Sequence, residues 1–185
     1  GHLITGKVVV RMRELGYRHV MESPSPDTAD LHNVIGLHDV IEVQQLLARY
    51  AVGMTKNDVE SVMDVFTSDG TYSAFGDTYV LADFPTLVAA APKGLFMVGL
   101  PVVDLDAGAG TGTGEQPLCF VDQTNHHMRI GWYTDTYLRT ERGWRLRTRS
   151  MTFLRKSGAR DSGRAHDPTR PTPTAASGSA DATAG

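Results

Sequence analysis

Three side chains in this sequence could transfer a proton or stabilise a negatively charged oxygen: Tyr50, Asp135 and His126. A tyrosine hydroxyl in an apolar cavity can donate a hydrogen bond to a developing enolate oxygen, and such donors contribute most where water is excluded. A carboxylate or an imidazole held next to a ligand can act as a general acid or base. We predict these three as the catalytic residues of any reaction that the protein carries out.

Each of the three also has a structural interpretation. Tyr50 could pack its ring in the core and bond its hydroxyl to a nearby acceptor. Asp135 could act as an acid or base if desolvated beside a tyrosine, or stay an ionised partner of Arg139. Asp122 could orient the imidazole of His126, but the Asp-Gln-Thr-Asn run that begins at Asp122 is also typical of a solvent-facing turn.

Methionine and aromatic residues outnumber these polar candidates. They suit an adaptable cavity for a bulky apolar ligand, although the same residues could also fill a core. The alternation of residues 129–139 puts Tyr133, Asp135, Tyr137 and Arg139 on one face of a strand. The residues that we predict to bind a ligand are Met54, Tyr72, Phe75, Phe96, Trp132, Tyr133 and Arg139.

The first part of the sequence must supply helices to position these groups. Asp39 and Glu42 form a capping-box-like start, and apolar residues then recur at spacings of three and four as far as Met54. A second short helix is predicted from Asn57-Asp58, with Phe66 on its inner face, up to a turn at Asp69-Gly70. A strand at 71–75 and a third helix at 84–91 follow.

Further along, the pattern is that of strands. Segments 95–105, 117–123, 127–140 and 144–156 are rich in Val, Thr, Phe, Tyr and Trp, and the turn at 141–143 joins the last two into a hairpin. The glycine run at 108–114 is predicted to be a flexible hairpin connection, because a phosphate-binding loop would need a helix directly after it. Helices followed by antiparallel strands indicate an α+β fold whose curved sheet wraps the helices.

The last predicted strand carries basic residues that we expect to form a solvated edge of the sheet. These residues are Arg145, Arg147, Arg149, Arg155 and Lys156.

Composition limits the classes of protein to consider. The chain has 185 residues, a net charge of -3 and 41% hydrophobic residues, so it lacks the basic excess of a nucleic-acid-binding protein. No apolar run approaches the roughly 20 residues that span a bilayer, and we predict a cytoplasmic protein that does not act on membranes. The single cysteine, Cys119, excludes an intrachain disulfide and is expected to be buried and inert. No ligand spacing indicates a metal site, and no cofactor is predicted.

Three segments are expected. Residues 1–36 are predicted to be a partly flexible extension, in which Gly1-His2 resembles a tag scar and 7–12 could form a short strand. Residues 37–156 are predicted to form the folded domain. Residues 157–185 are rich in Gly, Ala, Ser, Thr and Pro, with no recurring apolar positions, and are predicted to be a disordered tail.

Two stretches of the sequence resemble the SnoaL-like branch of the nuclear transport factor 2-like (NTF2-like) superfamily. They are VQQLLARYAVGMTKNDVESVMDVFTSDGTY and IGWYTDTYLRTERGWRLRTRSM. The resemblance implies an NTF2-like cone, with N-terminal helices packed in a strongly curved antiparallel or mixed sheet. It also implies an apolar small-molecule ligand and a homodimer.

The resemblance gives two alternatives for function, because this superfamily includes cyclases, isomerases, dehydratases, dehydrochlorinases and non-catalytic binders. Tyr50 is similar in position to the oxyanion-binding tyrosine of ketosteroid isomerases, but their carboxylate base falls near Ser73. The Asp and His of the dehydratases fall at Arg49 and Phe96. The chain is therefore either a cofactor-independent isomerase, cyclase or dehydratase of an apolar polycyclic or ketone substrate, or a ligand-binding or scaffold protein that has lost the dyad.

Overall fold

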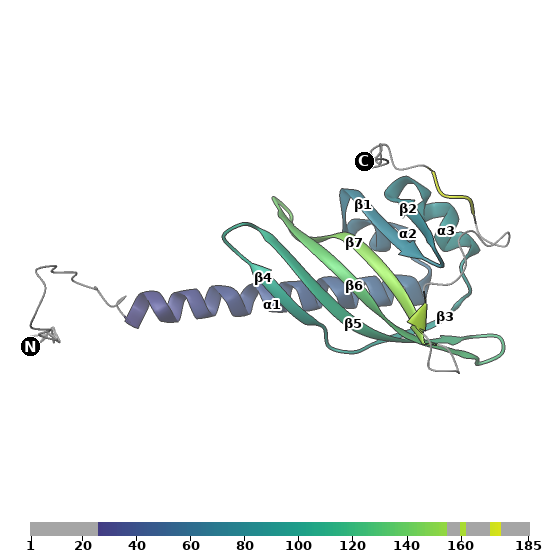
Figure 1. Ribbon diagram of the computed structural model, residues 1–185, viewed down its shortest axis with the longest axis horizontal. Helices are drawn as coiled ribbons and strands as arrows, with labels where there is room; N and C mark the ends of the chain where they lie inside the picture. The colour runs from purple at the N-terminus through teal and green to yellow at the C-terminus, as the bar shows by residue number, and fades with distance from the viewer. Residues whose placement is uncertain (1–25, 155–159, 162–170, 175–185) are drawn as a thin grey trace, which may run out of the picture.

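The computed structural model describes residues 26–154, 160–161 and 171–174, with side chains for 36–154 and 171–174. The helix α1 spans Pro26–Lys56. Its C-terminal part lies against the inner face of a curved sheet, and its N-terminal part projects beyond the sheet (Figure 1). It is followed by α2 (Val59–Asp64), the 3-10 helix η1 (Leu81–Asp83) and α3 (Phe84–Ala90). None of the helices in this described part is both long and apolar enough to cross a membrane.

The predicted start of α1 at Asp39 is wrong, because the helix begins at Pro26, inside the segment expected to be an extension. Asp39 and Glu42 do not cap the helix. Asp39 is buried and pairs with Arg139 at 3.3 Å, and a Glu42 oxygen accepts the backbone N–H of Trp144 at 2.9 Å. The two acidic side chains therefore attach the helix to the hairpin made by the last two long strands.

The described strands form one eight-stranded sheet. The strands are β1 (Phe66–Ala74), β2 (Asp77–Val80), β3 (Gly94–Val98), β4 (Val102–Asp106), β5 (Thr111–Asp122), β6 (Met128–Thr140), β7 (Gly143–Leu154) and β8 (Arg160–Asp161). Their order is β2-β1-β7-β6-β5-β3, with β4 also paired to β5 and β8 to β7. Only the β1–β7 pairing is parallel among these strands. The α+β cone expected from the sequence is confirmed.

Several strand boundaries differ from the prediction. The strand β1 begins at Phe66, so Phe66 is not on a helix, and the expected turn at Asp69-Gly70 is an irregularity within the strand. The stretch 95–105 is two strands, β3 and β4, separated by a segment that contains Pro101, which has no N–H to donate to a ladder.

Two further features of the sheet were not anticipated. The strand β2 follows a tight turn at Phe75-Gly76, where both residues have positive φ, as a two-residue hairpin requires. The glycine run is only partly a connection, because Gly112 and Gly114 lie within β5. A side chain at Gly112 would come within 2.9 Å of the Asp104 carbonyl oxygen of the neighbouring strand.

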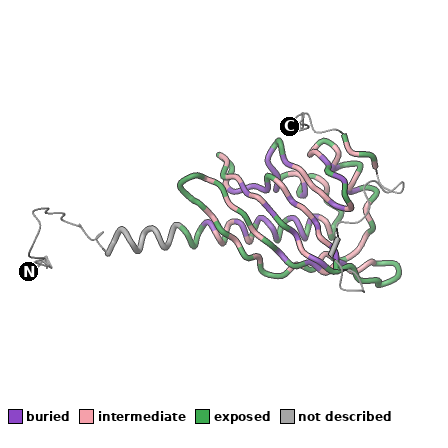
Figure 2. Tube along the Cα trace, in the orientation of Figure 1, coloured by how far each residue is buried: buried purple, intermediate pink, exposed green. Residues whose placement is uncertain are grey.

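The core lies between α1 and the concave face of the sheet. Val43, Leu47 and Tyr50 are buried on one side of the helix at the predicted spacings. They pack with buried residues of the sheet such as Tyr133 and Leu146. Figure 2 shows the buried positions gathered along the helix and on the strands that face it.

The expectation that the arginines of β7 form a solvated edge is wrong for two of them. Arg145 and Arg149 are buried, while Arg147 is exposed. A register shift between β6 and β7, where Thr136 pairs with Thr148 but Tyr137 pairs with Leu146, turns Arg149 to the inner face. Arg145 lies on the opposite face, where its Nη1 donates to the Trp144 carbonyl at 2.8 Å. Arg155 and Lys156 lie outside the described residues.

The C-terminal segment is not disordered throughout. Residues 160–161 add a short strand to β7, and residues 171–174 contact the domain. The predictions for 1–25, which include the tag scar and the short strand at 7–12, lie outside the described residues, as does most of the predicted tail.

Candidate functional site

A cavity of about 340 Å³ lies between the helices and the sheet. Tyr50 and Met54 of α1 line it, together with residues from α2, α3, β1, β2, β3, β5, β6, β7 and the C-terminal segment. Its volume is near the lower end of the roughly 300–1,000 Å³ that is usual for small-molecule pockets, which favours a compact ligand. Five of the seven predicted ligand-binding residues are in its wall: Met54, Tyr72, Phe75, Phe96 and Tyr133.

The cavity wall is apolar apart from a few side chains. The described lining includes the phenols of Tyr50, Tyr72, Tyr79 and Tyr133 and one charged group, Arg129. None of the described lining residues carries a carboxylate or an imidazole. Arg129 can only donate hydrogen bonds, and each protonated phenol can donate as well as accept, so the cavity can hold a ligand that presents an acceptor oxygen.

Tyr50 and Tyr133 are held by a buried arginine. The Arg149 guanidinium carbon lies 3.9 Å from the centre of the Tyr133 ring and 4.5 Å from that of Tyr50, and the two rings meet edge to face at 5.8 Å. Both tyrosines are almost fully buried. Cation–π contacts of this kind are strongest where the cation is desolvated, so Arg149 fixes the orientation of both phenols.

The hydroxyl groups of these two tyrosines affect each other's pKa. Burial raises the pKa of Tyr50, while the charge of Arg149 and the neighbouring Tyr133 hydroxyl act to lower it. Burial also raises the pKa of Tyr133 well above its ordinary value, and the neighbouring phenols of Tyr50 and Tyr72 raise it further. Both phenols therefore keep their protons at neutral pH, and either hydroxyl can donate a hydrogen bond.

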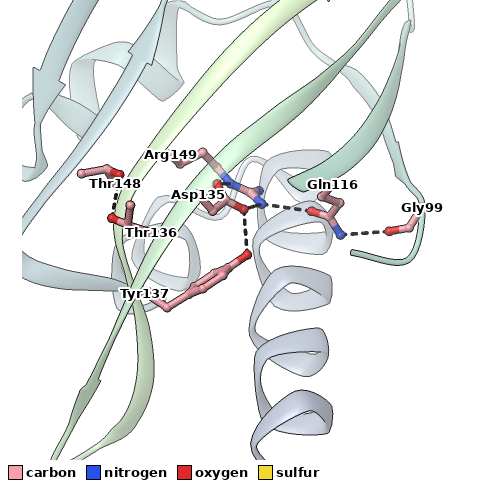
Figure 3. A network of polar contacts seen from close by, with 7 residues as sticks. All are labelled: Gly99, Gln116, Asp135, Thr136, Tyr137, Thr148 and Arg149. Atoms are coloured by element: carbon pink, nitrogen blue, oxygen red, sulfur yellow. Dashed lines mark hydrogen bonds and ion pairs between the residues drawn. The ribbon is translucent and has the colours of Figure 1, made fainter. Parts of the chain in front are cut away.

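Asp135 is the centre of a buried polar network (Figure 3). Arg149 donates to its two oxygens from Nε at 2.9 Å and from Nη2 at 2.7 Å, and the Tyr137 hydroxyl donates to it at 3.0 Å. Arg149 Nη2 also donates to Gln116 at 3.0 Å, and Gln116 donates to the Gly99 carbonyl at 3.0 Å. Asp135 is therefore an ion-pair partner, but of Arg149 and not of Arg139, and it is not among the described lining residues.

The network favours the charged form of Arg149. Burial disfavours the Arg149 cation, but the Asp135 carboxylate beside it has the opposite effect, and the pKa of Arg149 is raised. Burial, followed by the negative charge of Asp135, raises the pKa of Tyr137. Because both Asp135 oxygens already accept hydrogen bonds, this carboxylate is poorly placed to take a proton from a ligand.

His126 lies away from the cavity. It is exposed in the β5–β6 turn with a positive φ of 56°. The Asp122 carboxylate accepts the backbone N–H groups of Thr124 and Asn125 at 2.8 and 3.2 Å, as in the solvent-facing turn considered from the sequence. The structure does not bring His126 to Tyr50 or Asp135, and its catalytic role stays a prediction without support from its position.

Trp132 and Arg139 are also outside the described lining. Trp132 is half-buried and alternates along β6 with the inward-facing Tyr133. The Arg139 guanidinium pairs with Asp39 and lies 5.9 Å from the centre of the Trp144 ring. It therefore contributes to the attachment of α1 to the hairpin.

One group of possible metal ligands occurs among the described residues. Ligand atoms of His38, Asp39 and Glu42 lie within 4.8 Å of one another. Both carboxylates are engaged, Asp39 by the Arg139 guanidinium and Glu42 by the Trp144 N–H. These contacts attach α1 to the hairpin of β6 and β7. The positive charge of Arg139 would also disfavour the binding of a metal cation at this position.

Comparison with known proteins identifies the family. A model of the SnoaL-like domain matches residues 36–150. The chain belongs to the SnoaL-like family. An uncharacterised protein of Mycobacterium tuberculosis is 30% identical over 135 residues, which cover 65% of this chain and 88% of the relative.

Solved structures confirm the NTF2-like fold. An NTF2-like protein with a cystatin-like fold from Novosphingobium aromaticivorans has a TM-score of 0.57 and 21% identity, covering 75% of this chain and 96% of that one. A type 2 hexachlorocyclohexane dehydrochlorinase has a TM-score of 0.55 and 12% identity, covering 68% and 90%. At these identities the likeness concerns the fold alone.

Arg149 and Tyr79 are the main site residues that sequence reasoning missed. Arg149 was placed on a solvated edge, and only the register shift in β7 brings it inside the SnoaL-like domain. Tyr79 is on β2, a strand that was not predicted, and is buried in the cavity wall. The turn-forming Gly76, followed by the strand-favouring residues 78–80 (Thr, Tyr and Val), was a signal that could have identified this strand.

The buried ion pair gives a first prediction. Replacing Arg149 with Met should lower the free energy of unfolding by about 3–5 kcal/mol, because it leaves a buried carboxylate without its cation. Urea unfolding of the two proteins measures this. The matched control is Arg147→Met on the same strand, whose exposed pair with Asp69 spans 3.6 Å and should contribute under about 1 kcal/mol. Equal losses in the two variants would contradict the assigned role of Arg149.

The buried phenols predict a dependence of stability on pH. In the unfolded chain, Tyr50 and Tyr133 lose their protons near the ordinary pKa of 10.0, whereas in the folded protein both pKa values are raised. Above pH 10 the folded state therefore binds more protons, and the free energy of unfolding should fall as the pH rises. Urea unfolding from pH 8 to 11 measures the slope. In the double variant Tyr50→Phe/Tyr133→Phe the free energy of unfolding should fall less steeply with pH. An unchanged slope would show that these two phenols are not the cause of the pH dependence.

Proposed function

We propose that this SnoaL-like protein binds a compact apolar molecule with a carbonyl oxygen, and that Tyr50 donates a hydrogen bond to that oxygen. The observation that carries the proposal is the arrangement of Tyr50 and Tyr133 at the wall of a largely apolar cavity, with the Arg149 guanidinium against both rings. A polycyclic ketone has the required combination of ring surface and a single acceptor.

Binding without catalysis is the form of this proposal that the cavity favours. An isomerase or dehydratase needs a group that removes a proton from the ligand, within about 3 Å of the reacting carbon. The described lining includes no carboxylate or imidazole, and Asp135 is occupied by Arg149 and Tyr137. These observations support the alternative of a ligand-binding protein that lacks the Asp/His dyad of the dehydratases.

Isomerase, cyclase or dehydratase activity is the second candidate. The feature that favours it is the positive charge of Arg149 beside Tyr50, which would help that phenol to stabilise a developing negative oxygen. Incubation of the protein with ketone ligands, followed by mass spectrometry and chiral separation of the products, distinguishes turnover from binding. Turnover lost in Tyr50→Phe would support this candidate, and recovery of unchanged ligand would support binding alone.

The binding proposal predicts a selective effect of Tyr50→Phe. Its affinity for 2-acetylnaphthalene should fall about threefold to tenfold, as expected for one net hydrogen bond, because the ring stays and only the donor is lost. Its affinity for 2-isopropylnaphthalene, which has no oxygen, should be almost unchanged. Titration calorimetry with both ligands measures this difference.

The matched control is Tyr137→Phe, which removes a buried phenol that bonds to Asp135 and is not among the described lining residues. It should lower stability without the selective loss of ketone affinity. If Tyr50→Phe weakens both naphthalenes equally, Tyr50 contributes shape and not a hydrogen bond. If neither ligand binds the wild-type protein, the proposal is wrong for this class of ligand.

We also propose that a second copy of the chain covers the outer face of the sheet. Cross-strand neighbours share a face, and two apolar rows cross β3, β5 and β6 there: Met97, Cys119 and Ile130, and Leu95, Val121 and Met128. Four of these six residues are large hydrophobics that are about half or more exposed. A two-fold interface places the same patch on both copies, and these rows could bury one another in that way.

The dimer proposal is tested by mass in solution. The wild-type protein should elute as a dimer in size-exclusion chromatography with light scattering, and Met97→Glu/Ile130→Glu should elute as a monomer because burying two carboxylates is unfavourable. The control Leu37→Glu changes an exposed leucine on α1 and should stay dimeric. A monomeric wild-type protein would exclude this interface.

A further inference from the structure

The C-terminal segment Pro171–Thr174 forms part of the cavity wall. Pro171 is one of the lining residues, although it is far in sequence from the others. In Figure 1 this yellow segment runs beside β2 and α3, which also contribute residues to the cavity wall. The sequence predicted a disordered tail here, but this part of the tail lies next to the proposed ligand-binding cavity.

Two side chains of the domain hold this segment. The hydroxyl of Tyr79, which is fully buried and lines the cavity, donates to the Pro171 carbonyl at 3.1 Å. Asp83 of η1 accepts the Thr174 N–H at 2.9 Å and the Thr174 hydroxyl at 2.5 Å. Hydrogen bonds to a carboxylate are stronger than those between neutral groups, so the Asp83–Thr174 contact is the main attachment.

The composition of the segment suits a structure that attaches and detaches. Pro171 and Pro173 have fixed φ angles, so ordering the segment costs less conformational entropy than ordering an unrestricted chain. Among the described residues, three hydrogen bonds attach the two ends of the segment. Segments held by few contacts open at low free-energy cost compared with a packed core.

We propose that residues 171–174 form a strap that completes the wall of the ligand cavity and must detach before a ligand enters or leaves. This inference rests on the proposed ligand-binding function. Because the strap lines the cavity, a ligand that contacts Pro171 is bound more tightly when the strap is attached. By linkage, the same ligand favours attachment of the strap by an equal factor.

The test changes only the strap. In Thr174→Asp the new carboxylate lies next to Asp83, so repulsion replaces the hydroxyl hydrogen bond. Thr174→Ser keeps both donors and is the matched control. Stopped-flow fluorescence with N-phenyl-1-naphthylamine, a neutral apolar probe, measures association and dissociation. Both rates should rise about tenfold in Thr174→Asp, the change expected for loss of a charge-assisted hydrogen bond, and stay unchanged in Thr174→Ser.

The outcomes separate the strap from the binding function. Equal rates in Thr174→Asp and wild type would overturn the strap while leaving the cavity as a binding site. Probe binding to Thr174→Asp but not to wild type would support a strap that closes the cavity fully. Absence of binding to either protein would overturn both proposals.

Hydrogen exchange tests attachment without any ligand. The Thr174 amide donates to Asp83, so it should exchange more slowly in the wild-type protein than residue 174 does in Thr174→Asp. If this amide exchanges in the wild-type protein as fast as in an unstructured chain, the strap is not attached in solution and the proposal fails.

Discussion

The buried ion pair between Arg149 and Asp135 is the interaction on which the site depends. Two charges inside a small domain are tolerated only when their hydrogen bonds are largely satisfied. Here the two partners are on adjacent antiparallel strands, directly opposite each other in register. Gln116 and Tyr137 add one hydrogen bond each, while Arg149 Nη1 has no hydrogen-bond partner among the described residues. The pair therefore ties β5, β6 and β7 together beneath α1, and it places a positive charge against the two aromatic rings of the cavity wall.

This arrangement also explains the character of the cavity. The negative charge of the pair is directed towards Arg149 and Tyr137, while the guanidinium lies against the ring of Tyr50. A ligand in the cavity would meet neutral phenols backed by a cation, with the carboxylate turned to other partners. Such a wall would suit the carbonyl ligand proposed above, and none of its described lining residues carries a carboxylate or an imidazole that could remove a proton.

The sequence predicted the parts of the structure that depend on regular periodicity. The helical spacing around Tyr50 and the alternation of Tyr133 and Asp135 along β6 were correct, and five of the predicted ligand-binding residues line the cavity. The prediction misplaced Arg149 because β7 has one extra residue between the partners of Thr136 and Tyr137. Beyond this bulge, the residues of β7 that would face outward face inward. Composition alone gave no sign of this shift. The contacts of Pro171 were likewise invisible, because they depend on partners far away in the sequence.

The positions of the two tryptophans have a spectroscopic consequence. Trp144 is fully buried, with the Arg139 guanidinium over its ring and its backbone N–H bonded to Glu42 of α1. Trp132 is half-buried and belongs to the opposite face of the sheet. The protein thus contains two intrinsic fluorophores in different surroundings. Emission from Trp144 should respond when α1 separates from the hairpin of β6 and β7. Emission from Trp132 should respond when the outer face of the sheet is covered.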